Sequence, residues 1–246
     1  MAVESTGAPN ERERQSQSYA HGFNAVMGKY RIAALRPYCQ GESMLDIGCG
    51  EGPVTLGLAD LFTQVVGIDL NEVHLAAAIA AKPPEYVHFE VASIEEYQTQ
   101  LRFDTILVVD ILEHVVDPVA VLRKLEGLMS GKGRIIIVVP NAASIHRRIG
   151  LAMGMIASLE ELSPGDHKVG HRRYYSRETL RGDILAAGLE IHKEDGILLK
   201  PFSNAEMEKL PEAYADACFT AGSQLPDLCA ELVAVVKRPG FDRRDA

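Results

Sequence analysis

The chain has 246 residues, of which 47% are hydrophobic and 24% are charged, and its formal net charge is −9. This size and composition are typical of a globular protein, so we predict a single domain over residues 1–246. The acidic balance argues against nucleic-acid or anionic-membrane binding, because both partners require a basic surface. There is no signal peptide, no apolar run of the roughly 20 residues that span a membrane, and no cysteine pair with metal-site or disulfide spacing, so a cytoplasmic protein is expected.

The N-terminal region is expected to form a polar, disordered tail over residues 1–15, followed by a helix within residues 16–40. The helix is indicated by apolar side chains at helical spacing, among them Tyr19, Phe23 and Tyr30. Such a stripe usually packs into the core of a domain.

A short apolar strand, a glycine-rich loop and the start of a helix form the most informative motif of the chain. Gly48, Gly50 and Gly52 allow a sharp turn and a close approach of the backbone to a ligand, and Pro53 suits the first turn of a helix. The next apolar strand ends at Asp69, about 20 residues beyond the loop, where a carboxylate can accept hydrogen bonds from both ribose hydroxyls. The motif predicts a nucleoside site.

Two carboxylates beside the loop indicate which nucleoside binds. Asp46 and Glu51 would repel the pyrophosphate of a nicotinamide dinucleotide, and the loop lacks the GxGxxG spacing of that class. A ligand with a cationic amino-acid end would be attracted instead. In a purely structural alternative the glycines only make a turn and Asp69 caps the next helix. That alternative is disfavoured, because an Asp in the first strand and three alternating glycines are costly without a ligand.

Strands alternate with helices along most of the chain. Strands are expected at 44–47, 65–69, 86–91, 103–109, 133–139, 189–194 and 230–237. The alternation predicts an α/β, Rossmann-like, doubly wound fold with a mainly parallel seven-stranded sheet and helices on both faces. The regular pattern breaks at 141–175 and 197–228, which we interpret as acceptor-side lid insertions beside a cofactor-binding core at 41–140.

The motifs DIGCGEG and GID, in this order, resemble those of the class I S-adenosylmethionine-dependent methyltransferases, and the resemblance extends over roughly residues 40–140. It implies S-adenosylmethionine as the cofactor. The implied cofactor contacts are Asp46, Gly48, Cys49, Gly50, Asp69, Leu70, Ser93, Ile94 and Asp110. The family commonly carries an Asp near position 93 that accepts from the adenine amino group. This chain departs from that pattern, and Ser93 and Glu95 are the candidates to replace it.

The segment from Val109 to His114 is similar to that of the ubiquinone-biosynthesis O-methyltransferases and their small-molecule relatives. In the ubiquinone enzymes the matching acid and Glu-His pair have been linked to a divalent metal, so Asp110, Glu113 and His114 are candidate ligands. Their spacing would place them on one face of a helical turn. We favour the alternative that an Asp ends the strand and the Glu-His pair hydrogen-bonds the start of the next helix, and we retain His114 as a candidate catalytic residue.

The first insertion carries a local excess of positive charge in His146 to Arg148 and in His167 to Arg173. Arginines there could bind a carboxylate or phosphate of the acceptor, and His171 or His167 could act as the general base. A solvated surface is the alternative. The candidate acceptor contacts are Tyr19, Asn141, His146, Arg172, Arg173 and Tyr174, with Tyr19 included because the segment before the first strand often covers the site in the resembling family.

Together these features predict methyl transfer from S-adenosylmethionine to a small anionic metabolite, with oxygen as the first choice of target atom. Nitrogen or carbon methylation, as in natural-product pathways, is the nearest alternative. A nucleoside-binding regulatory protein without catalysis is the alternative from another class, and a nicotinamide oxidoreductase is disfavoured by the missing loop spacing. The identity of the acceptor and the oligomeric state stay open at this stage.

Overall fold

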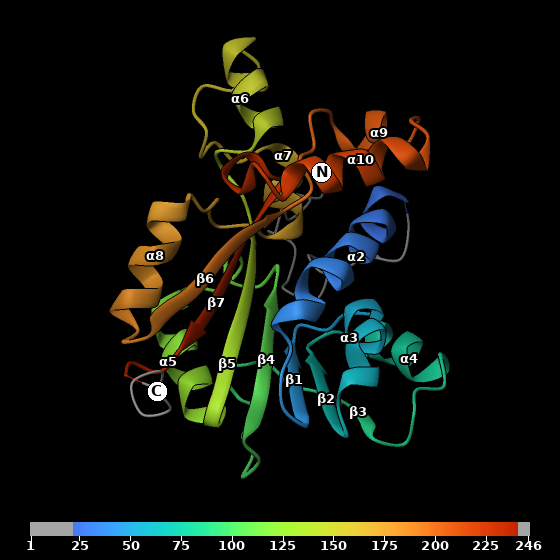
Figure 1. Ribbon diagram of the computed structural model, residues 1–246, viewed down its shortest axis with the longest axis vertical. Coiled ribbons are helices and arrows are strands. Elements are labelled where there is room, and N and C mark those ends of the chain that lie inside the picture. The colour runs from blue at the N-terminus through green and yellow to red at the C-terminus, as the bar shows by residue number, and fades with distance from the viewer. Residues whose placement is uncertain (1–21, 241–246) are drawn as a thin grey trace, which may run out of the picture.

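A seven-stranded sheet forms the centre of the computed structural model, which describes residues 22–240 (Figure 1). The strands lie in the order β3-β2-β1-β4-β5-β7-β6. Their bounds are β1 Ser43–Ile47, β2 Gln64–Asp69, β3 Val87–Val91, β4 Phe103–Val109, β5 Met129–Pro140, β6 Glu190–Ile197 and β7 Glu231–Lys237. The first five strands are parallel, and β7 is antiparallel to both of its neighbours. The predicted Rossmann-like, mainly parallel sheet is confirmed.

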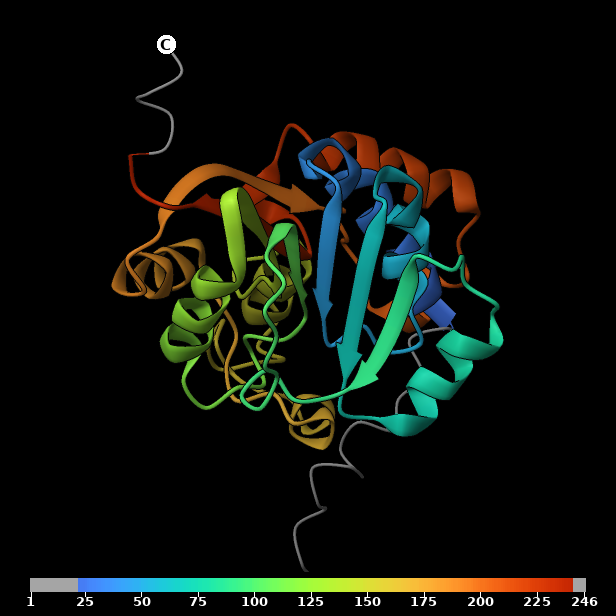
Figure 2. The same cartoon turned by 90° about the horizontal axis from the view of Figure 1, so that it is seen from below.

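Helices cover both faces of this sheet, as predicted. One face carries α2 (Gly22–Leu35), α3 (Pro53–Leu58), α4 (Glu72–Ala80) and α10 (Glu212–Gly222), and the other carries α5 (Pro118–Leu128) and α8 (Arg177–Ala186) (Figure 2). Leu45 and Ile47 pack with α5 and α8, whereas Met44 packs with α2 and α3, because successive strand side chains point to opposite faces. Burial on both faces explains the nearly continuous apolar sequence of β5.

Within the described residues, the N-terminal helix ends before the predicted bound of residue 40. α2 ends at Leu35 and continues as a 3-10 turn over Arg36–Tyr38. Pro37 accounts for this end, because proline lacks an amide hydrogen and disfavours helical backbone at the residue before it. The predicted tail at 1–15 and Tyr19 lie outside the described residues.

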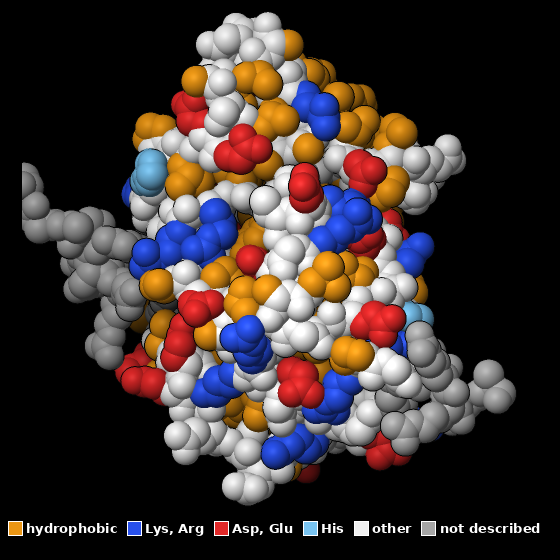
Figure 3. All heavy atoms as spheres, turned by 90° about the vertical axis from the view of Figure 1, so that its left-hand side faces the viewer, with side chains coloured by type: hydrophobic (Ala, Val, Ile, Leu, Met, Phe, Trp, Pro, Cys, Tyr) orange, Lys and Arg blue, Asp and Glu red, His pale blue; other side chains and the backbone are white. Residues whose placement is uncertain are grey.

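Both predicted insertions contain short helices at one end of the molecule (Figure 1). The first holds α6 (Ile145–Ala152) and α7 (Pro164–Val169), and the second holds α9 (Asn204–Met207) and α10. On the face in Figure 3, apolar side chains gather toward the end formed by α6, and basic and acidic side chains are interspersed below it. Met153 and Met155, which follow α6, are 69% and 71% exposed. Within residues 22–240, no helix combines the length and apolar character needed to cross a membrane.

Candidate active site

A cavity of about 430 Å³ lies where the glycine loop, the end of β2, the segment after β3 and the turn after β4 meet. All nine predicted cofactor contacts line it, namely Asp46, Gly48, Cys49, Gly50, Asp69, Leu70, Ser93, Ile94 and Asp110. These residues come together because the carboxyl ends of parallel strands share one edge of the sheet. The contact that each of them makes with a cofactor stays a prediction.

The glycine loop has the backbone geometry that the sequence indicated. Gly48 and Gly50 have φ angles of +68° and +55°, in the left-handed region that favours glycine. A Cβ on Gly48 would lie 2.0 Å from Cδ1 of Ile111, whereas a Cβ on Gly50 would meet no atom within 4 Å. The loop therefore packs tightly at Gly48 and leaves open space at Gly50, where a ligand can approach the main chain.

Asp69 joins the glycine loop to the end of β2. Its Oδ2 accepts a hydrogen bond from the backbone N–H of Gly50 at 2.8 Å, and its Oδ1 accepts from that of Asn71 at 2.8 Å. A carboxylate has about four acceptor positions, so acceptor capacity remains for the ribose hydroxyls. Asn71, rather than Asp69, caps α4 through its side chain. The helix cap proposed for Asp69 in the structural alternative is therefore supplied by Asn71, and the ribose contact of Asp69 stays a prediction.

Asp46 is more deeply buried than the charge argument assumed. Asp46 is only 2% exposed, and its carboxylate accepts a hydrogen bond from the Thr55 hydroxyl at 2.6 Å. Burial raises the pKa of Asp46 to about 7, against the opposing effect of the Thr55 hydrogen bond. Asp46 thus carries less than a full negative charge near neutral pH, and Asp69 is the more accessible carboxylate beside the loop.

The segment after β3 forms the adenine end of the cavity in the predicted arrangement. Ser93, Ile94 and Glu95 all line it, together with Glu96. The Ser93 hydroxyl accepts a hydrogen bond from the Glu96 backbone N–H at 3.0 Å, so it is committed to holding this turn. Glu95 is exposed at the rim, and both it and Ser93 remain the candidates for binding the adenine amino group.

A buried arginine that the sequence-based prediction missed reaches the cavity from α2. Arg31 is 9% exposed and forms ion pairs with Asp110 and with Glu231 at the start of β7. Asp110 itself has a φ of +53°, a left-handed conformation that is uncommon for a non-glycine residue and typical of functional sites. Arg31 therefore fixes the Asp110 side chain and places a cation beside the cofactor site.

The sequence did contain a signal for Arg31. Phe23, Met27, Arg31 and Leu35 recur at intervals of four and are all buried on the same side of α2. A charged residue in the core-facing row of an amphipathic helix requires a charged partner, which is a functional indication. His74, in the first turn of α4, is a second missed residue, since it is 7% exposed and lines the cavity.

The opposite end of the cavity is mainly apolar and contains one imidazole. His114 lines it beside Ile111, Val115 and Val116 from the turn after β4, and Val169, Gly170 and Arg172 close it from the first insertion. Burial, reinforced by the nearby His171, lowers the pKa of His114 to about 4. His114 is therefore a neutral imidazole near neutral pH.

His171 lies behind His114 and does not line the cavity, and its role as a base toward the acceptor stays a prediction. The two rings meet edge to face with centroids 4.7 Å apart. The Nδ1 atom of His171 is 3.1 Å from Oδ1 of Asp166, whose pKa is lowered mainly by its hydrogen bonds with His171 and Ser163 despite its burial. Asp166 was also missed, although Ser163 and Asp166 have the spacing of a capping box at the start of α7.

The metal-ligand prediction changes in one member. The ligand atoms of Glu113, His114 and His171 lie within 4.8 Å of one another, whereas Asp110 is paired with Arg31. Both carboxylate oxygens of Glu113 are buried without a hydrogen-bond partner, and burial together with Asp110 raises its pKa well above the usual value. The favoured alternative was wrong as well, because Asp117 caps α5 in place of the Glu-His pair.

The arginines of the first insertion bond mainly to the backbone of the protein. Four of them donate hydrogen bonds to backbone carbonyl groups, which an irregular segment must satisfy without regular secondary structure. The acceptors are the carbonyls of Leu159 and Glu161 for Arg147, Ala143 for Arg148, His114 for Arg172, and Leu112 and Val116 for Arg173. Of these arginines, Arg172 lines the cavity and Arg173 does not.

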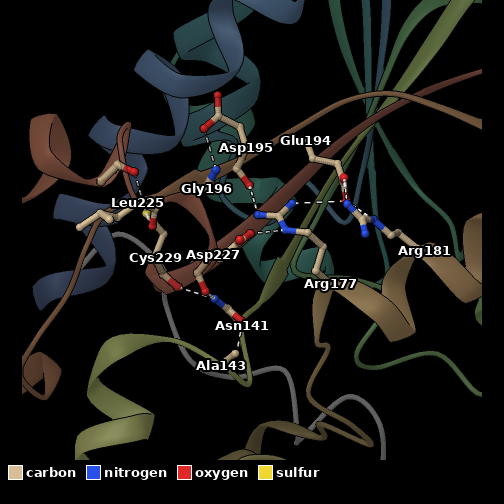
Figure 4. Close-up of polar contacts among 11 residues, drawn as sticks. Asn141, Ala143, Arg177, Arg181, Glu194, Asp195, Gly196, Leu225, Asp227 and Cys229 are labelled. Carbon is tan, nitrogen blue, oxygen red and sulfur yellow. Dashed lines mark hydrogen bonds and ion pairs between the residues drawn. The ribbon is translucent and has the colours of Figure 1, made fainter.

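Asn141 has a structural role, and its predicted contact with the acceptor stays a prediction. Its amide donates to the carbonyls of Asp227 and Cys229 at 3.0 and 2.8 Å, and its Oδ1 accepts from the Ala143 N–H at 2.8 Å (Figure 4). Arg177 supports the same region by bonding Asp227 and the Asp195 carbonyl. Asn141 therefore ties the end of β5 to the segment before β7.

Two further predicted acceptor contacts, His146 and Tyr174, lie outside the cavity lining. The Tyr174 hydroxyl donates to Asp166 at 3.1 Å, and its ring stacks under the Arg147 guanidinium at 3.8 Å. Burial and the nearby Lys200 and Arg147 lower the pKa of His146 to about 3. Tyr174 thus stabilises the insertion through Asp166 and Arg147.

The sheet order, the left-handed glycine loop and the acid at the end of β2 define a class I S-adenosylmethionine-dependent methyltransferase. Comparison with known proteins agrees. A family model described as a methyltransferase domain matches residues 19–194, and the chain belongs to this family.

The similar proteins include ubiquinone biosynthesis O-methyltransferases. The one from Xanthomonas axonopodis pv. citri is 28% identical over 193 residues, covering 76% of this chain and 78% of the relative. The one from Aeromonas salmonicida is 30% identical over 172 residues, covering 67% and 69%. A crystal structure of an S-adenosylmethionine-dependent methyltransferase from Mesorhizobium loti shares the fold, with a TM-score of 0.61, 18% identity and coverage of 88% of this chain and 100% of that chain.

Proposed function

We propose that the protein transfers the methyl group of S-adenosylmethionine to a hydroxyl oxygen of a small, phenol-like acceptor that carries a carboxylate. The observation that carries this proposal is the position of the His114 imidazole among Ile111, Val115 and Val116 at the apolar end of the cavity. A flat apolar ring suits these walls. Arg172, at the same end, is the candidate partner for the carboxylate.

In the proposed reaction, the acceptor oxygen attacks the methyl carbon as the bond from that carbon to sulfur breaks. The hydroxyl proton passes to the neutral His114, and the sulfonium becomes the thioether of S-adenosylhomocysteine. The products are a methyl ether, S-adenosylhomocysteine and one proton, so charge and atoms balance. Because the sulfonium already activates the methyl group, the protein contributes mainly alignment and proton removal.

Oxygen is favoured as the target atom by two independent considerations. A hydroxyl requires a base, and His114 is neutral and available in the cavity. The relatives described above are named O-methyltransferases of ubiquinone biosynthesis. Nitrogen and carbon acceptors are the alternatives, and a regulatory protein without catalysis is disfavoured because it would have no use for a base at this position.

An assay with S-adenosylmethionine labelled in its methyl group tests this function. The acceptor panel contains carboxylated catechols, the same catechols without the carboxylate, aromatic amines and carbon acids. We expect label in the carboxylated catechols first, with a higher KM and a similar kcat when the carboxylate is removed. Transfer to an amine or carbon acid in preference to a phenol would contradict the oxygen assignment. Binding of the cofactor with no transfer to any class would favour the regulatory alternative.

We expect activity to survive removal of divalent metals. Glu113, His114 and His171 have donor atoms that fit a divalent cation, which would polarise an acceptor oxygen when bound. The proposed proton transfer uses His114 without such an ion. The measurement is turnover after exhaustive chelation and after readdition of Mg²⁺ or Zn²⁺, with bound metal determined by elemental analysis. Loss of activity that is restored by one metal, at one ion per chain, would replace the base assignment with metal activation.

A further inference from the structure

We infer that Arg173 is a positioning residue that holds His114 in the cavity, an inference that rests on the proposed role of His114. The turn from Ile111 to Val116 carries His114 and lacks regular secondary structure. Arg172 and Arg173 hold this turn from a distant part of the chain, and we call this pair the 172–173 clamp. No part of the clamp was assigned to positioning by the sequence patterns.

The clamp donates hydrogen bonds to four carbonyl groups of the turn. The Arg172 backbone N–H donates to the Glu113 carbonyl at 2.8 Å, and Nε of Arg172 donates to the His114 carbonyl at 2.8 Å. Arg173 spans the turn with its fork, since Nη1 donates to the Leu112 carbonyl at 3.0 Å and Nη2 to the Val116 carbonyl at 3.3 Å. Two adjacent residues thus hold both ends and the middle of the turn.

Backbone bonds also hold the turn and the residue before it. The N–H of His114 donates to the Ile111 carbonyl at 2.9 Å, and the N–H of Asp110 donates to the Val138 carbonyl at 3.0 Å. The carbonyls on either side of His114 point to the clamp. Because an arginine fork is planar and rigid, its two bonds fix the separation of the Leu112 and Val116 carbonyls as well as their positions.

The same clamp forms part of the cavity wall. Val169, Gly170 and Arg172 line the cavity from the first insertion, and Val115 and Val116 line it from the turn. By joining the first insertion to the turn, the clamp fixes the width of the cavity at its acceptor end. It also fixes the direction of the His114 ring. Arg173 lies outside the lining, so its effect on the reaction is carried through the turn.

The test compares Arg173→Ala and Arg173→Lys in the full chain with Arg123→Ala as a matched control. Arg123 also donates to a backbone carbonyl, that of Ala186 at 2.7 Å, but it lies between α5 and α8, away from the cavity. The first readout is amide hydrogen exchange in residues 110–117 with S-adenosylhomocysteine bound. We expect faster exchange confined to this segment in both Arg173 variants, because lysine keeps the charge and loses the fork.

The second readout is kinetic, with the panel acceptor that the parent protein methylates fastest. We expect kcat to fall about tenfold to a hundredfold in Arg173→Ala, since a small misplacement of a catalytic group has an effect of this order. The KM for S-adenosylmethionine should stay within about twofold, and added guanidinium ion should restore part of kcat. Arg123→Ala should match the parent in both readouts.

Three outcomes overturn the inference. These are parent-like kcat in Arg173→Ala, faster exchange throughout the chain, or a raised KM for a carboxylated acceptor with unchanged kcat. The second outcome indicates a general structural role, and the third indicates direct binding of the acceptor.

If His114→Ala itself keeps parental turnover, the proposed function fails. If His114→Ala is impaired and Arg173→Ala is not, the positioning inference alone fails.

Discussion

Replacement of His114 by alanine should lower kcat by about 10²- to 10³-fold, the range expected for loss of a general base. The affinity for S-adenosylmethionine should remain within about twofold, because the imidazole acts at the acceptor end of the cavity.

The pH profile gives a separate signature. A base must be neutral, and burial with the adjacent His171 lowers the pKa of His114 to about 4. The pH dependence of kcat/KM reports the ionisation of groups in the free enzyme. In the parent, kcat/KM should therefore rise with pH as His114 loses its proton around pH 4, and then level off.

The matched control is His88→Ala, which removes an exposed imidazole on β3 and should leave turnover unchanged. In His114→Ala the loss should shrink at high pH, where a phenolic acceptor ionises without a base, and imidazole added to the buffer should restore part of the rate. Parental kcat in His114→Ala would contradict the assignment. So would an unaltered pH profile together with the expected loss of rate, since that combination indicates a steric role for the ring.

Replacement of Asp69 by alanine should weaken cofactor binding by about tenfold to a hundredfold. The carboxylate has acceptor capacity facing the ribose position, and hydrogen bonds to a charged group contribute roughly 1.5–3 kcal/mol. The same carboxylate holds the Gly50 N–H at 2.8 Å, so the substitution also releases the glycine loop. Titration calorimetry with S-adenosylhomocysteine measures the effect directly and requires no acceptor.

Glu72→Ala is the matched control for Asp69, because it removes an exposed carboxylate from the first turn of α4 without altering the cavity lining. The ribose contact can be separated from the loop contact with 2′-deoxy and 3′-deoxy forms of the ligand. If Asp69 binds the hydroxyls, the difference between parent and variant should diminish with these analogues. Equal affinity of the parent and Asp69→Ala for the natural ligand would exclude the ribose assignment.

The cofactor side of the protein was predictable from sequence because its determinants are local. Gly48 and Gly50 adopt positive φ angles that other residues rarely adopt, so their requirement is visible in the motif itself. Strand periodicity placed Asp69 and Asp110 at the ends of parallel strands, and such ends meet in any doubly wound sheet. Only the burial of Asp46 was misjudged, because the degree of solvent exclusion depends on the packing of Thr55 above it.

The acceptor side was less predictable for a related reason. The excess of arginine in the first insertion was visible, but a guanidinium donates equally well to a ligand and to a backbone carbonyl. Which of these it meets depends on the path of an irregular segment, and such a path has no periodic signature. Asn141 illustrates the same point, since an amide at the end of a strand became a fully bonded tie between segments 86 to 88 residues apart.

The sequence by itself determined the fold, the cofactor class and the edge of the sheet where the reaction occurs, because glycine conformation and hydrophobic periodicity are encoded in neighbouring residues. The tertiary structure alone decided which side chains line the cavity. It placed His114 in the cavity and His171 behind it, and it brought Arg31 to Glu231 across 200 positions. Contacts of this kind join residues that are distant in the chain, and they exist only once the helices and insertions have packed against the sheet.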